Sequence, residues 1–391
     1  MKNKRTPDIR FAGFTGDWEH CNLGDISTKI GSGKTPKGGS QNYKSEGIPL
    51  LRSQNIFNDK VNFNDVVYIT PEIDEDMANS RVQKDDVLLN ITGASIGRSA
   101  VYKLNHKANV NQHVSIIRPS SKVNPYFIQL NIASEKGQKQ IELNQAGGGR
   151  EGLNFQQIAK MGFYFPDLLE QGEIGDFFIK LDNTIALYQQ ELTILNQTKQ
   201  GFLQKMFPKE GKSVPEVRFP GFTGEWELRK IREIGDLSAG GDINKSKLVD
   251  NEKYPVLANA LTNDGIIGYY NEYKIEAPAV TITGRGDVGH AKARHINFTP
   301  VVRLLVLKAD GFDVDFLENC INTRNIFVES TGVPQLTVPQ LGTYEISFPS
   351  FREQTKIGRF FKQLDDTISL HQSEIEALQK MKKAFLQKMF V

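Results

Sequence analysis

The chain has few of the features that mark secreted, membrane-bound or metal-binding proteins. It holds only two cysteines, Cys21 and Cys320, which are too few for a disulfide framework or a cysteine-based metal cluster. No segment approaches the ~18 consecutive apolar residues of a membrane span. The charged first residues, MKNKRTPDIRF, lack the apolar core of a signal peptide. These absences predict a cytoplasmic protein without a membrane partner.

The excess of charge of either sign is also small. Lysines and arginines number 48 against 46 aspartates and glutamates, which gives a net charge of +2. A nucleic-acid surface, if present, must therefore be local, because the bulk charge does not indicate one. The composition, with 39% apolar and 24% charged residues in 391, is that of a globular protein. At roughly 100–200 residues per domain, the length allows two or three domains.

Complete catalytic and cofactor motifs are absent as well. The GSGKT segment at residues 31–35 resembles the end of a phosphate-binding loop, but Thr28 stands where that motif requires its first glycine. The NPYF segment at 124–127 lacks one proline of an adenine methyltransferase tetrad, and Pro125 favours a helix start instead. The six histidines form no zinc-binding pattern. We therefore predict no catalytic residues, no metal ligands and no enzyme activity of the chain's own.

An internal repeat is the clearest feature that the sequence does contain. Residues 8–19 read DIRFAGFTGDWE, and residues 216–227 read EVRFPGFTGEWE. Each half ends in FLQKMF, at 202–207 and at 385–390. The segment PKEGKSVP at 208–215 has the composition of a linker. The chain is therefore a duplicated module.

Each half ends in a long helical pattern with apolar residues spaced three and four apart. The seam positions are Phe178, Leu181, Ile185, Tyr188, Leu192, Leu195, Lys199, Phe202 and Met206 in the first half, and Phe361, Leu364, Ile368, His371, Ile375, Leu378, Lys382, Phe385 and Met389 in the second. This spacing is typical of helices that pack lengthwise as a coiled coil. The alternative is an ordinary amphipathic helix buried against a domain. Lysine recurs at one seam position, which suggests a marker of register.

Chain order predicts the arrangement of these parts. A short linker joins the end of the first helix to the second globular part, so the two helices should run antiparallel. We predict an α+β protein with two mixed α/β lobes separated by two long antiparallel helices in a coiled coil, with a pseudo-two-fold internal repeat. The predicted boundaries are 1–171 for the first lobe, 172–208 for the first helix, 209–352 for the second lobe and 353–391 for the second helix. Short β-type runs such as VLLNIT, HVSIIRP, AVTITG and VVRLLVLK indicate strands in the lobes.

Each lobe contains one basic, glycine-rich stretch, at 26–57 and at 284–308. Lysine and arginine neutralise phosphates, whereas arginine, asparagine and glutamine can contact base edges. The candidate DNA contacts of the first lobe are Lys34, Thr35, Lys37, Gln41, Tyr43, Arg52, Gln54, Asn55, Thr92, Ser95, Arg98, Gln112 and Arg150. Those of the second lobe are Lys245, Lys247, Asn259, Arg285, His290, Lys292, Arg294 and Gln335. The alternative for either stretch is a solvated surface, and for Tyr43, Thr92 and Asn259 a packed or turn-stabilising residue.

Taken in order, these motifs resemble those of the specificity subunits of type I restriction–modification enzymes. The resemblance covers essentially the whole chain. It rests on the half-chain repeat, the RF-x-GF-x-G-[DE]-WE segments at 10–19 and 218–227, and the helices that end in FLQKMF. It also rests on IPLLR at 48–52, VLLNITGASIG at 87–97 and NQH at 111–113.

The resemblance implies a non-catalytic DNA reader. Each lobe would be a target-recognition domain for one half of a bipartite, asymmetric sequence in double-stranded DNA. The helices would set the spacer and dock two methylation subunits, which restriction subunits with motor and nuclease activity would join. S-adenosylmethionine, ATP and Mg²⁺ would be held by those partners, and this chain would bind no cofactor. The alternative is a coiled-coil tether with two protein-binding lobes, which would show no salt-dependent affinity for DNA.

Overall fold

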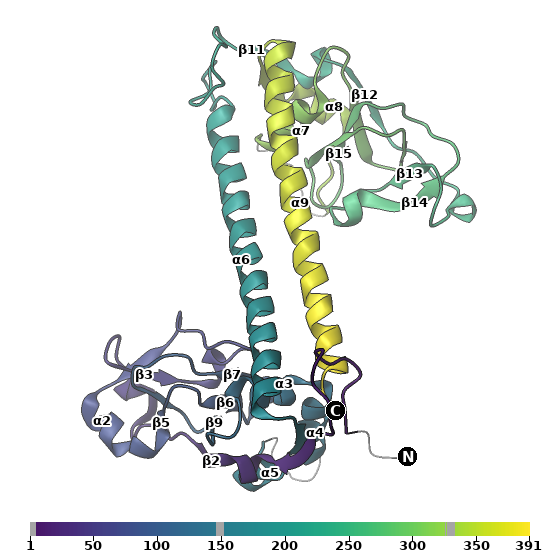
Figure 1. Ribbon diagram of the computed structural model, residues 1–391. Coiled ribbons are helices and arrows are strands. Elements are labelled where there is room, and N and C mark those ends of the chain that lie inside the picture. The colour runs from purple at the N-terminus through teal and green to yellow at the C-terminus, as the bar shows by residue number, and fades with distance from the viewer. Residues whose placement is uncertain (1–4, 146–151, 325, 327–332) are drawn as a thin grey trace. The chain divides into compact units, whose positions relative to one another are not determined.

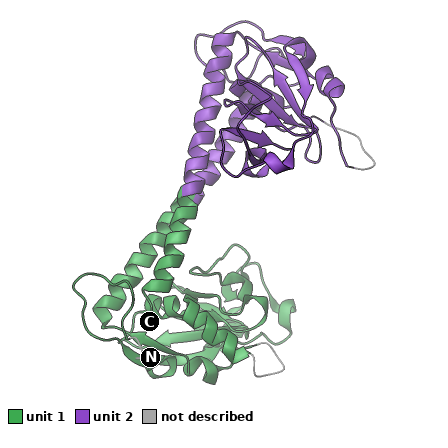
Figure 2. Cartoon of the chain, turned by 90° about the vertical axis from the view of Figure 1, so that its right-hand side faces the viewer, with its two compact units in different colours: residues 1–188, 374–391 green, residues 189–373 purple. Residues whose placement is uncertain are grey.

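The computed structural model describes residues 5–145, 152–324, 326 and 333–391. The chain divides into two compact units, unit 1 with residues 1–188 and 374–391, and unit 2 with residues 189–373 (Figure 2). Two long helices, α6 (Leu168–Met206) and α9 (Phe351–Lys388), each contribute residues to both units (Figure 1). Both helices begin slightly earlier than the predicted residues 172 and 353. Within the described ranges, no helix is long and apolar enough to cross a membrane.

The strands of unit 1 form two four-stranded sheets and one two-stranded sheet among the described residues. The first sheet has the order β2 (Ser27–Ser32), β9 (Val114–Pro119), β6 (Val87–Asn90), β7 (Ser99–Val101). The second has the order β4 (Val67–Ile69), β3 (Ile48–Leu51), β8 (Ala108–Val110), β5 (Arg81–Val82). The pair β1 (Glu19–Asn22) and β10 (Gly162–Phe165) lies apart from both sheets in the pairing. The β-type runs VLLNIT and HVSIIRP supply β6 and β9, and their apolar side chains are buried.

Short helices connect and cover these sheets in unit 1. They are α1 (Leu23–Ile26), α2 (Pro71–Asp76), α3 (Pro125–Ala133), α4 (Glu135–Gln145) and α5 (Phe155–Ala159), with the 3₁₀ turns Gly39–Asn42, Ser53–Asn55, Ala78–Ser80 and Gly93–Ser95. The Asn124 side chain accepts hydrogen bonds from the backbone N–H groups of Tyr126 and Phe127, at 2.9 and 3.3 Å. Pro125 occupies the first turn of α3, where its missing N–H costs nothing. The Asn-Pro pair is therefore a helix start, as its sequence predicts.

Unit 2 repeats the strand order of unit 1, except that its second sheet has three strands among the described residues instead of four. Its first sheet has the order β12 (Asp236–Ala239), β18 (Leu304–Lys308), β15 (Ala279–Thr283), β16 (Ala291–Arg294). Its second has the order β14 (Ile266–Tyr270), β13 (Tyr254–Leu257), β17 (Thr299–Pro300), and β11 (Glu227–Lys230) pairs with β19 (Glu345–Phe348). The helices are α7 (Val314–Asn322) and α8 (Val338–Thr343), and the 3₁₀ turns are Ile231–Glu233, Lys245–Lys247 and Thr262–Gly265. The two lobes thus share a topology although their sequences diverge.

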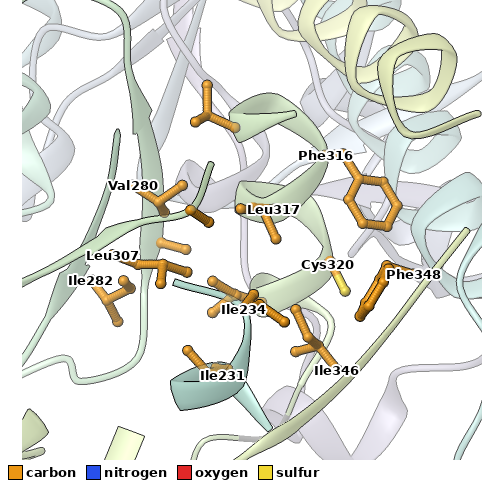
Figure 3. Packing of buried hydrophobic residues seen from close by; sticks show 14 of the residues in the cluster. Ile231, Ile234, Val280, Ile282, Leu307, Phe316, Leu317, Cys320, Ile346 and Phe348 are labelled. Atoms are coloured by element: carbon orange, nitrogen blue, oxygen red, sulfur yellow. The ribbon is translucent and has the colours of Figure 1, made fainter. Parts of the chain in front are cut away.

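The core of unit 2 shows how sheet and helix pack in such a lobe. Val280 and Leu307, on neighbouring strands, face Leu317 of α7 (Figure 3). Cys320, on the same helix, lies close to Phe348 of β19 and is fully buried (Figure 3). Burial raises the pKa of the Cys320 thiol to about 12. Cys320 therefore acts as a small apolar residue of the core.

The repeated sequence segments meet in one aromatic cluster in each unit. In unit 1 the ring centroid of Phe127 lies 5.6 Å from that of Trp18 and 5.4 Å from that of Phe390, and Phe390 lies 6.1 Å from Phe178. The cluster of unit 2 consists of Trp226, Phe316, Phe207 and Phe361, with corresponding distances of 5.7, 5.5 and 5.9 Å. The last aromatic residue of each FLQKMF segment is therefore a core residue. Unit 1 is completed by the end of α9, and unit 2 by the end of α6.

A buried ion pair joins each RF-x-GFTG segment to the first turn of a long helix. In unit 1 the Arg10 guanidinium donates from Nε and Nη2 to the two carboxylate oxygens of Glu170, at 2.6 and 2.7 Å, and from Nη1 to the Gly16 carbonyl, at 2.8 Å. Glu170 has no exposed surface. In unit 2 Arg218 makes the same bidentate contact with Glu353, at 2.7 and 2.7 Å. The duplicated arginines are thus structural.

The residue after each of these glutamates ties the helix start to the lobe. The Gln171 side chain donates to the Pro166 carbonyl and accepts from the backbone N–H of Asn124, both at 2.9 Å. In unit 2 Gln354 donates to the Pro349 carbonyl at 2.9 Å and accepts from the Asp313 N–H at 3.2 Å. A Glu-Gln pair at the start of each helix therefore holds the repeat segment and the lobe helix together.

The long helices run antiparallel within each unit, as predicted. In unit 1 Lys382 of α9 pairs with Asp182 of α6 at 2.6 Å, and it also contacts Asp59 of the lobe. In unit 2 Lys199 of α6 pairs with Asp365 of α9 at 2.5 Å. The recurring seam lysine is thus an ion-pairing position that fixes the alignment of the two helices. All the seam side chains are buried or half-buried, whereas apolar residues outside the seam, such as Leu187 and Leu370, are exposed.

The ion pair at the helix start makes a testable prediction about stability. Replacing Glu170→Gln removes the charge partner of Arg10 while keeping the shape of the side chain. We expect the free energy of unfolding of unit 1 to fall by about 2 kcal/mol, below the ~3–5 kcal/mol of a fully buried pair because Arg10 keeps some exposure. Thermal unfolding and hydrogen exchange of unit 1 measure the loss.

The matched control is Glu173→Gln, which changes an exposed glutamate on the same helix. This control should leave unfolding unchanged. Equal stability of the two variants would show that the Arg10–Glu170 pair does not hold the helix start.

Candidate nucleic-acid interface

The predicted DNA contacts of unit 1 lie mostly on loops at one end of its first sheet. Strand register shows this directly, because Ser32 at the end of β2 pairs with Ser115, and Asn90 at the end of β6 pairs with Val114. The loops that follow β2 and β6 and the one that precedes β9 must therefore leave the sheet at the same end. They carry Lys34, Thr35, Lys37 and Gln41, then Thr92, Ser95 and Arg98, and then Gln112.

A chain of hydrogen bonds connects these three loops. The Thr35 hydroxyl donates to Oε1 of Gln112. Nε2 of Gln112 lies 3.1 Å from Nε2 of His113, and Nδ1 of His113 lies 2.6 Å from the Thr92 hydroxyl oxygen. Gln112 is exposed, and the other three side chains are half-buried. The end of the sheet therefore presents an ordered polar surface rather than independent loops.

A second group of polar residues surrounds the 3₁₀ turn after β3. Arg52 donates to the Asp65 carbonyl at 3.0 Å, and Gln54 donates to the Asp65 carboxylate. The Arg52 guanidinium carbon also lies 5.8 Å from the centre of the Tyr43 ring. Arg98 is exposed and lies 5.9 Å from the centre of the Phe57 ring. Arg52, Gln54 and Arg98 would contact DNA by leaving or sharing these intramolecular partners.

Two predicted contacts of unit 1 have other roles or places. Asn55 is 2% exposed, and its side chain accepts from the Arg52 N–H at 2.9 Å and donates to the carbonyls of Asn62 and Asp65, both at 3.1 Å. Its amide is therefore used within the turn, which favours turn stabilisation over the predicted DNA contact. Ser95 accepts a hydrogen bond from the Asn90 side chain at 3.1 Å. Arg150 lies outside the described residues.

Unit 2 brings the corresponding loops together at the same end of its first sheet. Thr283 at the end of β15 pairs with Leu304 at the start of β18, and Ile282 pairs with Ala291 at the start of β16. Arg285 and His290 are exposed on the loop between β15 and β16. Gln335 is exposed and forms an isolated antiparallel bridge with Arg285 through the backbone. Lys245 and Lys247 are exposed on the loop after β12, where Lys247 lies 3.5 Å from Glu272.

Two further predictions in unit 2 fall on residues with intramolecular partners. Asn259 donates to the Val302 carbonyl at 3.1 Å and accepts from the Gly284 N–H at 2.7 Å, so its amide links three loops. Arg294 donates to the Thr281 hydroxyl and to the Asp264 carbonyl, both at 2.9 Å. For Asn259 this geometry favours the turn-stabilising alternative, and for Arg294 the DNA contact stays a prediction.

Burial shifts the pKa values of two charged groups near β16, Arg294 and Glu318. Burial lowers the pKa of the Arg294 guanidinium, although arginine remains charged at neutral pH. Burial also raises the pKa of the Glu318 carboxyl, which lies 3.6 Å from the Lys292 ammonium. Lys292 and Lys247 each lie beside a glutamate, at 3.6 and 3.5 Å, so the positive surface of unit 2 depends more on Arg285 and Lys245.

Close packing explains why the GSGKT segment has a glycine at position 33. A side chain at Gly33 would overlap the carbonyl oxygen of Val110, and one at Gly240, the equivalent position in unit 2, would overlap that of Val301. Both glycines let the chain leave the first sheet close to the strand of the second sheet. The close approach of the two backbones accounts for the glycine that resembles a phosphate-binding loop, so no nucleotide is needed to explain it.

Sequence reasoning missed His113, Glu170, Gln171, Glu353 and Gln354. His113 stands beside Gln112 in the NQH segment, but a histidine without a metal-binding pattern gives no signal of its own. The Glu-Gln pairs could have been found, since they recur at the same place before the two seams. In the part of the chain that the structure describes, no group of three or more His, Cys, Asp or Glu residues could hold a metal ion.

Comparison with known proteins identifies the family. The sequence model of the type I restriction modification DNA specificity domain matches residues 15–197 and 223–380. The type I restriction enzyme MjaVIII specificity subunit of Methanocaldococcus jannaschii is 22% identical over 95% of this chain and 91% of its own length. The type I restriction enzyme EcoBI specificity subunit of Escherichia coli is 28% identical over 52% of this chain and 41% of its own.

The solved structures agree on the fold. The S subunit of a type I restriction–modification system from M. genitalium superposes with a TM-score of 0.69 at 13% identity, over 99% of both chains. A chain from a solved type I restriction–modification assembly gives a TM-score of 0.51 at 14% identity, over 94% of this chain and 96% of that chain. With two matched domains and two lobes of the same topology, this chain belongs to the family of type I restriction modification DNA specificity domains and is a DNA specificity subunit.

Proposed function

We propose that each unit reads one half of a bipartite, asymmetric DNA sequence. The observation that supports this most is the repeated strand order, which carries different polar side chains at the same end of each first sheet. Unit 1 presents Lys34, Thr35, Lys37 and Gln112 there, and unit 2 presents Arg285 and His290. Because the two units share a sheet topology but present different side chains, we expect them to recognise different base sequences in the two half-sites.

The chemistry of the exposed residues fits this role. Lysines neutralise phosphates and position the protein, while arginine and glutamine can form paired hydrogen bonds with guanine and adenine edges in the major groove. The chain's own role is then recognition without catalysis. Methylation subunits that bring S-adenosylmethionine, and restriction subunits that use ATP and Mg²⁺, would supply the chemistry.

The first test maps the methylated sequence. The chain is co-expressed with its methylation subunit in a host that lacks N6-methyladenine, and the modified positions are mapped across the genome. We expect one asymmetric bipartite motif. Exchanging residues 27–119 for those of a relative should change one half-site only, because the exchange leaves the aromatic cluster and the Arg10–Glu170 pair in place.

A change in both half-sites would show that the units do not read independently. A stable complex that leaves no mark would favour the tether hypothesis.

We also propose that the two long helices set the spacer between the half-sites. Both helices pass from one unit to the other, α6 at residues 188–189 and α9 at residues 373–374. Inserting seven residues at each point keeps the seam in phase, since seven residues make two turns of the coiled-coil repeat. At 1.5 Å per residue, each insertion adds about 10 Å, or about three base pairs of DNA.

The mapped spacer should therefore lengthen by about three base pairs while both half-sites stay the same. A seven-residue insertion in α6 alone is the control, because it leaves α9 without a matching length. An unchanged spacer in the doubly extended variant would refute the proposed role of the helices.

We further propose that two methylation subunits dock on the long helices, at their exposed apolar residues. Leu187, in unit 1, is 55% exposed, and Leu370, at the equivalent position in unit 2, is 57% exposed. Single exposed leucines are ordinary, but the same exposed position in both halves suits two copies of one partner. The start of each helix repeats this feature, with Leu168 and Phe351 also exposed.

We expect Leu187→Asp and Leu370→Asp each to reduce the copurifying methylation subunits from two to one, and the double variant to none. A buried, unpaired carboxylate at an interface costs several kcal/mol. Mass measurement of the purified complexes gives the stoichiometry. Gln190→Asp and Gln363→Asp, which place the same charge at exposed polar positions, should keep two; equal losses in all four variants would rule out this docking surface.

A further inference from the structure

In each unit, one side chain at the candidate interface uses all of its polar atoms to contact other residues, and these contacts connect separate loops. In unit 1 this residue is His113, which lies between Gln112 on its own loop and Thr92 on the loop after β6. Gln112 in turn reaches Thr35 on the loop after β2. In unit 2 it is Asn259, whose amide reaches Gly284 on the loop after β15 and Val302 on the segment before β18.

The hydrogen-bond directions in unit 1 follow from the chemistry of the groups. Because Oε1 of Gln112 accepts from Thr35, its NH₂ group must donate toward Nε2 of His113. Nε2 then carries no proton, and Nδ1–H donates to the Thr92 oxygen at 2.6 Å. Thr92 keeps its own hydroxyl proton and Gln112 keeps its second amide proton. The neutral imidazole of His113 therefore determines which hydrogen-bonding groups of Thr92 and Gln112 remain available to DNA.

In unit 2 the positioning residue, Asn259, acts on backbone groups rather than on side chains. Asn259 fixes the Gly284 N–H and the Val302 carbonyl with one amide group. Gly284 directly precedes Arg285, and Val302 directly precedes Arg303, which adopts a positive φ of 70°. One asparagine therefore holds the backbone of the residue that precedes each of these two arginines. Without it, the Arg285 loop would lose this side-chain link to the segment before β18 and would be held there by the pairing of Thr283 with Leu304.

We propose that His113 and Asn259 are positioning residues, one for each half-site, which set sequence discrimination without contacting bases. The inference deepens the proposed function and rests on it. Both ring nitrogens of His113 and both amide atoms of Asn259 are engaged within the protein. Their contribution is then to hold Gln112 and Thr92 in unit 1, and the Arg285 loop in unit 2, in the orientation that the cognate bases require.

The test uses the complex with methylation subunits and duplexes of the mapped motif. Each duplex carries a single base change in one half-site, and a duplex without the motif measures non-specific binding. His113→Phe removes both hydrogen bonds and keeps the ring. We expect discrimination at the half-site of unit 1 to fall about tenfold, the effect of one lost paired contact. Discrimination at the other half-site, non-specific affinity and its salt slope should stay unchanged.

Asn259→Ala should give the mirror result, with loss at the half-site of unit 2 alone, so each variant is the control for the other. Partial variants separate positioning from folding. His113→Asn places an amide donor near the position of Nδ1 and should keep the Thr92 contact and part of the discrimination. Asn259→Asp should likewise keep the acceptor for Gly284.

The possible outcomes distinguish this inference from the proposed function. If the unmodified complex shows no preference for the motif over other DNA, the proposed function fails and the inference with it. If the unmodified complex discriminates and His113→Phe and Asn259→Ala discriminate equally well, the inference alone is overturned. Loss of non-specific affinity with a reduced salt slope would also overturn it, because it would place these residues on phosphates.

Discussion

The buried pair of arginine and glutamate at the start of each long helix is the contact on which the rest of the structure depends. Arg10 holds the duplicated turn against Glu170, and the next residue, Gln171, holds the lobe helix α3 through the backbone of Asn124. Three segments that are distant in sequence therefore meet at one helical turn. The aromatic cluster beneath it adds the end of the other long helix. Because unit 2 repeats both features, each unit requires a segment from the other half of the chain.

Such a pair contributes to specificity of folding more than to stability. Removing a guanidinium and a carboxylate from water carries a large desolvation penalty, which the bidentate contact and the carbonyl acceptors offset only in part. An apolar pair could fill the same space, but it would not fix the helix start against the turn at a defined angle. A defined angle matters to a DNA reader because its loops must meet a rigid duplex. The shared geometry of the two frames leaves the lobes free to differ, and they differ in their loops and in the elements α2, α4 and β5, which have no counterpart among the described residues of unit 2.

The sequence predicted the periodic parts of this fold well and the interface only in outline. The seam could be found because a coiled coil repeats its pattern locally, and the seam lysines proved to pair with Asp182 and Asp365 across it. The loops could be found from their basic, glycine-rich composition. Which side chains stay available could not be found, because Asn55 and Asn259 are occupied by backbone groups that only strand pairing brings near. His113 was missed for the same reason, since its partner Thr92 is brought to it by the register of β6 and β9.

The near-neutral net charge of the chain and its internal ion pairs both bear on how strongly it binds DNA. Arg10, Arg218, Arg81 and Arg118 all face carboxylates within the protein, the last two at 2.6 and 2.8 Å, so these four arginines contribute little to the attraction of DNA phosphates. Non-specific binding to DNA scales with the number of phosphates that a protein neutralises. We expect a chain with a net charge of only +2 to bind DNA of any sequence weakly, so that correct base contacts contribute a larger share of its total affinity. Low net charge and ordered polar loops therefore act together: the first lowers the affinity for all DNA, and the second restores affinity for one sequence.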